Sequence, residues 1–213
     1  MAAGKLSPRQ KMINLMYLVF IAMLAMNMSK EVLQAFGLMD QKLVSATEAA
    51  TSRNNLSYED LRLKAVEQSE KYADEKDKAE KIKKLSDDYY NYIENLKNEM
   101  KATVKDPTDY ETMDKGKFLD DKFFKGNDGD YKPDGQAFLD NINNYTSQVG
   151  AILGKEYKNV ATDATNRFTT AKVVDRDGKE RFWLDYNYKG FPLIASLTKL
   201  TQIQADIKAT ESE

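Results

Sequence analysis

The sequence contains no cysteine and no histidine. Without cysteine, disulfides, thiolate nucleophiles and sulfur-ligated metal centres are excluded. Without histidine, the chain lacks the commonest general base and the commonest zinc ligand. Catalysis would have to use carboxylates, lysine, tyrosine or serine alone, and no motif of that kind is present. The sequence therefore predicts a protein that is not an enzyme and that has no cofactor and no metal site.

Acidic residues are missing from the first 30 positions, which carry four basic side chains: Lys5, Arg9, Lys11 and Lys30. Residues 31–213 carry the other 28 basic side chains and all 34 acidic ones, a balance of −6. Because non-specific nucleic-acid binding needs a basic face, this acidic body argues against a nucleic-acid partner.

Long uncharged stretches are also rare, and the one that stands out runs from Met12 to Met28. Ser7 is placed to cap a helix that starts at Pro8, with Gln10 three residues on to complete a capping box. From residue 8 to residue 28 such a helix is about 31 Å long, close to the roughly 30 Å of a bilayer core. The sequence therefore predicts a transmembrane helix over residues 8–28.

The flanking charges predict the orientation of this helix. Lys5, Arg9 and Lys11 precede the apolar run, whereas Glu31 directly follows Lys30. The positive-inside rule makes residues 1–7 a short cytoplasmic tail, with Lys5 and Lys11 as topology charges, and places residues 29–213 on the other side of the membrane.

A cleaved signal peptide is the main alternative to an anchor. No A-x-A cleavage site followed by a polar break is present, and the helical pattern continues beyond the apolar run. A heptad seam predicts that the anchor extends into a helix outside the membrane and suggests packing between copies. The seam consists of Val32, Phe36, Met39, Leu43, Ala46 and Ala50.

Several polar residues of the anchor are candidate functional residues. Arg9 is either a topology charge or a cation that enters the membrane edge and pairs with a partner's carboxylate. Asn14 and Tyr17 share a helix face with Gln10. They are candidate contacts to partner membrane helices, or simply one helix–helix hydrogen bond and one interfacial ring.

The remaining chain is predicted to be mainly α-helical. A charged stripe without Pro or Gly predicts one long helix over residues 56–104, followed by a loop over 105–135 and a helix over about 135–158. Residues 168–188 predict a β-hairpin with Asp-Gly at its tip, and Pro192 opens a last helix over about 192–210. This helix has no stop signal, which leaves open a truncation at Glu213. The fold class is thus mainly α: a transmembrane helix that continues into an elongated helical bundle with a small β-hairpin.

Within the predicted loop, Asp128 and Asp130 belong to an Asn-Asp-Gly-Asp turn. The alternating ligands and terminal Glu of a calcium-binding EF-hand are absent. An acidic turn is therefore the favoured interpretation, and cation binding by Asp128 and Asp130 stays open.

The N-terminal residues closely resemble those of the GldM/PorM family, which belongs to the gliding-motility and type IX secretion machinery of Bacteroidetes. The resemblance covers residues 4–39. It rests on the stretches Lys5–Ala25 (KLSPRQKMINLMYLVFIAMLA), Asn27–Leu33 (NMSKEVL) and Ala35–Met39 (AFGLM).

The resemblance implies a single-pass protein of the bacterial inner membrane with its bulk in the periplasm. It implies a homodimer whose two membrane helices sit inside a ring of five GldL-like subunits. It also implies that the other partners are periplasmic components of the secretion complex. The pair would convert proton-motive force into movement, with Arg9 paired to a glutamate of the ring. The alternative is a passive membrane-anchored scaffold of the same complex.

Overall fold

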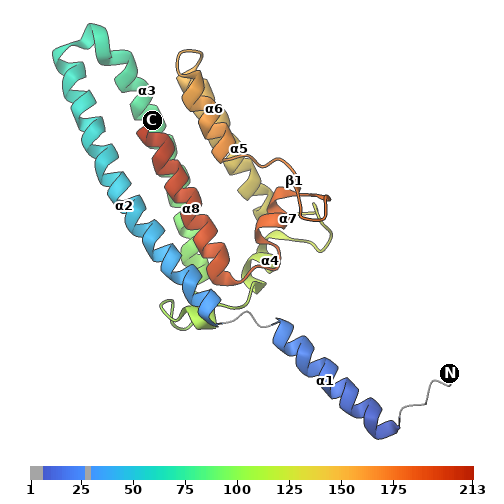
Figure 1. Cartoon of the computed structure of the whole chain (residues 1–213). Coiled ribbons are helices and arrows are strands. Elements are labelled where there is room, and N and C mark those ends of the chain that lie inside the picture. The colour runs from blue at the N-terminus through green and yellow to red at the C-terminus, as the bar shows by residue number, and fades with distance from the viewer. Residues whose placement is uncertain (1–6, 27–29) are drawn as a thin grey trace.

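A computed structural model describes residues 7–26 and 30–213 of the chain. The described residues form mainly α-helices and one two-stranded antiparallel sheet, as Figure 1 shows, which confirms the mainly helical class with a small β element. The elements in chain order are α1 (Pro8–Met26), α2 (Lys30–Glu67), α3 (Ser69–Lys101), the 3-10 helix η1 (Tyr110–Thr112), α4 (Lys117–Phe123), α5 (Pro133–Leu153), α6 (Lys158–Arg167), β1 (Val173–Val174), β2 (Glu180–Arg181), α7 (Trp183–Tyr188) and α8 (Leu193–Ser212).

Helix α1 covers most of the predicted membrane segment, whose last two residues, 27 and 28, lie outside the described residues. The side-chain oxygen of Ser7 accepts a hydrogen bond from the backbone N–H of Gln10 at 3.3 Å, so Ser7 caps the helix as predicted. Among the residues that the structure describes, no helix combines the length and the apolar character needed to cross a membrane.

The prediction of one long helix over residues 56–104 is wrong. Helix α2 ends at Glu67, Gln68 takes the non-helical angles φ −134° and ψ 62°, and α3 starts at Ser69. Helices α2 and α3 lie side by side and run in opposite directions (Figure 1). Folding back lets both helices bury their apolar faces against α8, whereas one straight helix would leave much of its stripe without a partner.

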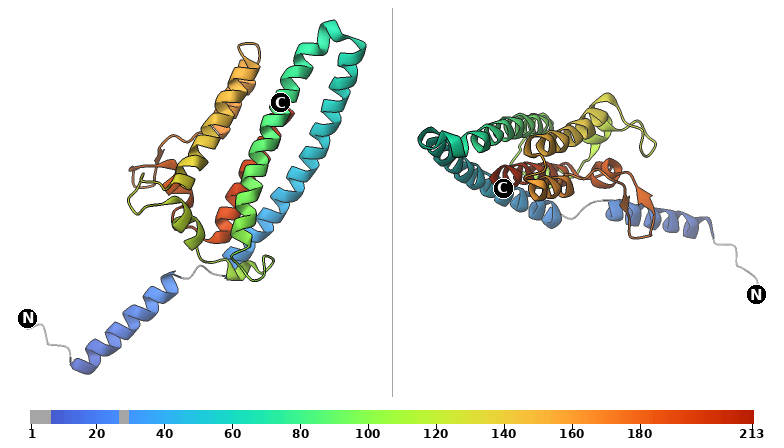
Figure 2. Two further views of the ribbon diagram at one scale, coloured as in Figure 1. Left: turned by 180° about the vertical axis from the view of Figure 1, so that it is seen from behind. Right: turned by 90° about the horizontal axis from the view of Figure 1, so that it is seen from above.

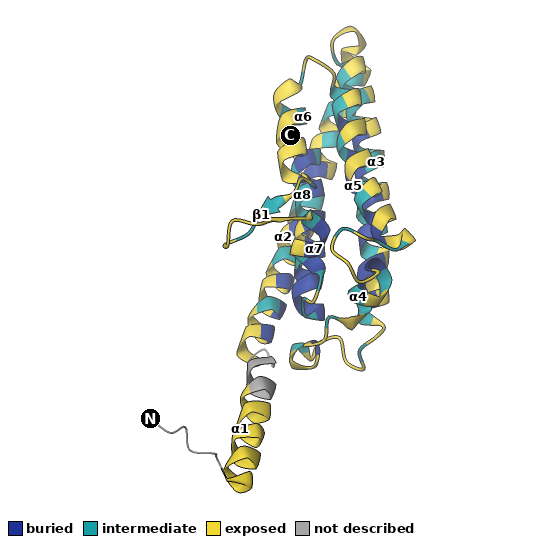
Figure 3. Cartoon of the chain, turned by 90° about the vertical axis from the view of Figure 1, so that its right-hand side faces the viewer, coloured by how far each residue is buried: buried dark blue, intermediate teal, exposed yellow. Residues whose placement is uncertain are grey.

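Helix α8 lies at the centre of the bundle, in contact with α2, α3 and α6, as the two views of Figure 2 show. It follows Pro192 as predicted and ends part-way along α2 and α3. Leu200 and Ile207 are fully buried. Figure 3 shows buried residues along most of α8, which places this helix in the core.

Polar side chains also hold α8 in place. The ammonium of Lys97 donates a hydrogen bond to the side-chain oxygen of Gln204 at 2.6 Å, and Lys97 is only 2% exposed. The side-chain amide of Asn54 donates to the carbonyl of Lys208 at 2.8 Å, and Thr201 donates to the carboxylate of Asp40. Because buried polar groups need partners, these bonds favour one axial position of α8.

The predicted helix over 135–158 is divided in two. Helix α5 ends before Gly154, whose φ of +63° suits glycine, and α6 starts at Lys158. The spacing of Phe138, Ile142, Tyr145, Val149 and Ile152 at steps of four and three predicts an apolar seam on this helix. The first four of these residues are buried and Ile152 is half-buried.

The predicted loop over 105–135 contains two short helices, η1 and α4. Leu119 and Phe123 of α4 are buried, so α4 docks this segment onto the bundle.

The predicted hairpin over 168–188 is confirmed only near its tip. Val173 pairs with Arg181 and Val174 with Glu180 around a turn that contains Gly178. The predicted second strand is instead mostly α7, because Leu184 and Tyr188, four residues apart, both point into the core.

Candidate functional site

The predicted functional residues that the structure describes lie along α1. Arg9, Gln10 and Lys11 are exposed in its first turn, and Asn14 and Tyr17 follow on the face of Gln10. Lys5 lies outside the described residues. Within the described part of the chain, none of these five side chains forms a hydrogen bond or ion pair with the bundle.

The large apolar side chains of α1 are exposed as well, and Figure 3 shows its described surface as exposed throughout. Their exposed fractions range from 45% at Val19 to 68% at Met16. Full burial of one such side chain contributes about 1.5–3 kcal/mol. While these side chains are exposed to water, the helix lacks this contribution. The exposed residues are Met12, Ile13, Leu15, Met16, Tyr17, Leu18, Val19, Phe20 and Ile21.

A second apolar surface, here called the outer stripe, follows the side of α2 that faces away from α8. Met39 is 54% exposed, Leu56 73% and Leu63 56%. The heptad seam that the sequence predicts for α2 does not coincide with the buried face of this helix, and the two differ by about one residue around the helix axis. The buried face contains Leu33, Gly37, Asp40, Thr47 and Asn54. The outer stripe consists of Ala35, Met39, Ala46, Ala49, Leu56 and Leu63, all exposed at intervals of three, four or seven residues.

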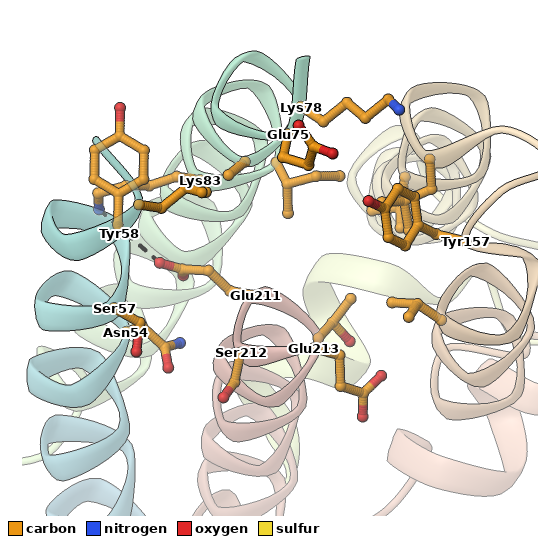
Figure 4. A pocket seen from close by; sticks show the side chains of 17 residues that line it. Asn54, Ser57, Tyr58, Glu75, Lys78, Lys83, Tyr157, Glu211, Ser212 and Glu213 are labelled. Atoms are coloured by element: carbon orange, nitrogen blue, oxygen red, sulfur yellow. Dashed lines mark ion pairs between the residues drawn. The ribbon is translucent and has the colours of Figure 1, made fainter. Parts of the chain in front are cut away.

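A cleft of about 250 Å³ lies where α8 ends, between α2, α3, α5 and α6. Figure 4 shows Lys83 and Glu211 facing each other at its edge, 4.0 Å apart. Glu211 also pairs with Lys208 at 2.7 Å, and Lys78 pairs with Glu156 at 2.9 Å. Ion pairs at the edge of an apolar cleft do not resemble a nucleophile with its general base.

The acidic turn is held by basic side chains. Asp128 pairs with Lys189 at 2.9 Å and with Arg181 at 3.2 Å, and Asp130 pairs with Lys125 at 3.3 Å. Hydrogen bonds from Lys189 lower the pKa of Asp128 below its ordinary value. In the described residues no group of three or more acidic side chains is arranged to hold a metal ion.

The sequence did not identify the buried polar contacts of α8. Their only signal is that Asp40, Thr47 and Asn54 recur every seven residues along α2. Polar residues at this spacing share one helix face, but they indicate that the face is buried only when their partners on α8 are known.

The fold and its surfaces define a class of protein: a helical bundle that carries an exposed apolar helix at one end and a second apolar stripe along one side. The model of the GldM N-terminal domain matches residues 31–213. The chain therefore belongs to the GldM family. Membership implies a component of the gliding-motility and type IX secretion machinery in the cell envelope, and the family is a motility family rather than an enzyme family. No curated protein matches the chain.

Proposed function

We propose that this chain is an inner-membrane motor subunit of the type IX secretion and gliding machinery. In this proposal the segment of residues 8–28, of which α1 is the described part, spans the membrane with its N-terminus in the cytoplasm, and residues 29–213 lie in the periplasm. The observation that carries the proposal is the surface of α1, where exposed apolar side chains follow a basic first turn without any acidic residue. A bilayer would cover this surface, and the basic end would stay on the cytoplasmic side.

Arg9 is the residue that would couple ion flow to movement. It lies at the end of α1, exposed and without an ion pair within the described residues. A glutamate of a GldL-like ring would be tolerated in lipid while it is paired with Arg9, and its protonation would release the guanidinium. Gln10, Asn14 and Tyr17 would add hydrogen bonds to the same ring.

The outer stripe of α2 would join two copies of the chain. Two such stripes can pack against each other because their apolar side chains recur in a heptad pattern. With two anchors inside one ring of five subunits, the two copies of Arg9 would face unequal surroundings. Sequential protonation around the ring would then turn the pair, and the periplasmic bundles would pass the movement to other secretion components.

A passive scaffold is the alternative, because the exposed apolar surface of α1 would equally suit a plain anchor. Replacing residues 8–28 with an unrelated apolar helix that keeps the flanking charges distinguishes the two functions. The motor proposal predicts a membrane-inserted protein at normal level that supports neither gliding nor secretion. Normal gliding and secretion with the unrelated helix would establish the scaffold instead.

A further inference from the structure

A short segment, here called the brace, packs against the start of α2. The brace consists of residues Tyr110–Met113. The ring of Tyr110 lies flat against Gly37 of α2. A Cβ atom on Gly37 would come within 2.1 Å of the Tyr110 ring, so only glycine leaves space for it. One helical turn further along α2, the side-chain amide of Gln41 donates a hydrogen bond to the hydroxyl of Tyr110 at 2.8 Å.

A third contact joins the brace to the first residue of α2. The ammonium of Lys30 pairs with Glu111 at 2.8 Å. Both side chains are substantially exposed, so this pair alone adds little stability. Lys30, Gly37 and Gln41 lie seven and four residues apart, on one face of the helix. The brace therefore holds the first three turns of α2 along one side.

The same turns of α2 are held from another side by α8. Leu33 is 1% exposed in the core, and the hydroxyl of Thr198 donates to the carbonyl of Phe36 at 3.1 Å. The brace itself is tied to α8, because Met113 is buried and its carbonyl accepts a hydrogen bond from the backbone N–H of Ile194 at 3.4 Å. The start of α2 is thus fixed between two elements that also contact each other.

The opposite end of α2 is held much less firmly. Between Asn54 and Ile82, across the turn into α3, every residue is at least partly exposed. Figure 1 shows that the braced end of α2 is the one nearest α1. A displacement that enters α2 from α1 would therefore reach α8 through the braced turns, not through the open end.

We propose that Tyr110 is a positioning residue that locks the start of α2 to the bundle, so that movement of α1 is transmitted to the whole periplasmic part. This inference rests on the proposed motor function. It adds that the anchor and the bundle are coupled by a specific wedge, Tyr110 against Gly37, in addition to the general packing of α2 on α8.

Gly37→Ala tests the wedge in the full chain expressed in cells. The added methyl group displaces the Tyr110 ring. Gly150→Ala in α5 is the matched control, because a Cβ at Gly150 meets no atom within 4 Å. We expect Gly37→Ala to lose gliding and secretion at a normal protein level, with faster amide exchange over residues 31–41, and we expect Gly150→Ala to keep both activities.

A reversible cross-link separates coupling from folding. The chain has no other cysteine, so Gln41→Cys with Tyr110→Cys provides a single pair of thiols. Without a cross-linker this variant lacks the wedge and should lose gliding and secretion. A bifunctional methanethiosulfonate reagent that joins the two thiols should restore both activities, and a reducing agent should abolish them again. Because a cross-link also stabilises a fold, the protein level and circular dichroism of the unlinked variant are measured beside its activity, and we expect both to match the parent.

Two results would overturn the inference: full activity of Gly37→Ala with the brace shown by exchange to be open, or a cross-linked cysteine pair that stays inactive. Failure of the motor proposal is distinguishable, because it would appear as normal activity after replacement of Arg9. If Arg9 is essential while an open brace has no effect, only the role of Tyr110 is refuted.

Discussion

Replacement of Gln204 with Leu tests whether buried polar contacts fix the position of α8. Lys97 lies in the core, and its ammonium donates to Gln204 at 2.6 Å and lies 3.4 Å from the carboxylate of Glu94. Burial lowers the pKa of Lys97 below the ordinary value for lysine, and the nearby carboxylate of Glu94 opposes this effect. Leucine has a similar volume but cannot accept a hydrogen bond.

The expected cost follows from what remains around Lys97. A hydrogen bond to a charged group contributes about 1.5–3 kcal/mol. Removal of one partner from a buried charge costs about 3–5 kcal/mol when nothing replaces it. Because Glu94 remains close, we expect Gln204→Leu to lower the unfolding free energy by about 2–3 kcal/mol. For a domain of this size that is a fall in Tm of about 4–12 °C.

Thermal and urea unfolding of residues 30–213, followed by circular dichroism, measure this change. This fragment contains every residue of the buried core, from Leu33 to Ile207. Lys97→Met combined with Gln204→Leu removes the buried charge together with its hydrogen-bond acceptor and leaves the carboxylate of Glu94, which is 36% exposed, to be hydrated by water. This double variant should return the stability to within about 1 kcal/mol of the parent. A Gln204→Leu variant within about 0.5 kcal/mol of the parent, or a double variant no better than the single one, would refute the reasoning.

Two further predictions concern acid stability and assembly. Burial alone would raise the pKa of Asp87, but hydrogen bonds from lysines, chiefly Lys208 at 2.9 Å, outweigh burial and lower it. The charged Asp87 therefore stabilises the folded state fully above the ordinary pKa of 3.8, and this stabilisation is lost as the pH falls through the pKa of the folded state. In urea titrations, the unfolding free energy of Asp87→Asn should therefore fall less on acidification than that of the parent. The double substitution Met39→Glu and Leu56→Glu in the outer stripe should make the dimeric full chain monomeric, as measured by light scattering. The control Val174→Glu changes a residue on the hairpin that is 64% exposed, and it should leave the dimer intact. A monomeric parent chain would contradict the proposed dimer.

Local periodicity predicted the parts of the fold whose partners lie nearby or whose apolar residues form one continuous face. The seam of α5 and the start of α8 after Pro192 are of this kind. The break at Gln68 could not be predicted, because no Pro or Gly marks it and its cause is the distant helix α8. Residues 183–188 were misassigned because a short aromatic run fits a strand as well as a helix until its core contacts are known.

In the candidate site, too, local signals could be found in the sequence, whereas contacts between residues far apart in the chain could not. Arg9 and the polar face of α1 stay predictions, made from charge asymmetry beside an apolar run, which is a local signal. The sequence could not identify the wedge of Tyr110 on Gly37, since 72 intervening residues separate the two in the chain. It also placed the buried face of α2 one residue away from its true position, because Asp40 and Asn54 are buried by polar partners on α8.

Replacement of Arg9 tests the central claim most directly. Arg9→Ala and, separately, Arg9→Lys would be introduced into the full chain, and gliding and type IX secretion would be measured in cells with the membrane level and complex assembly verified. The motor proposal predicts that Arg9→Ala abolishes both activities while the protein stays at its normal level in an assembled complex. Normal gliding and secretion by Arg9→Ala cells would reduce Arg9 to a topology charge and contradict the proposed coupling.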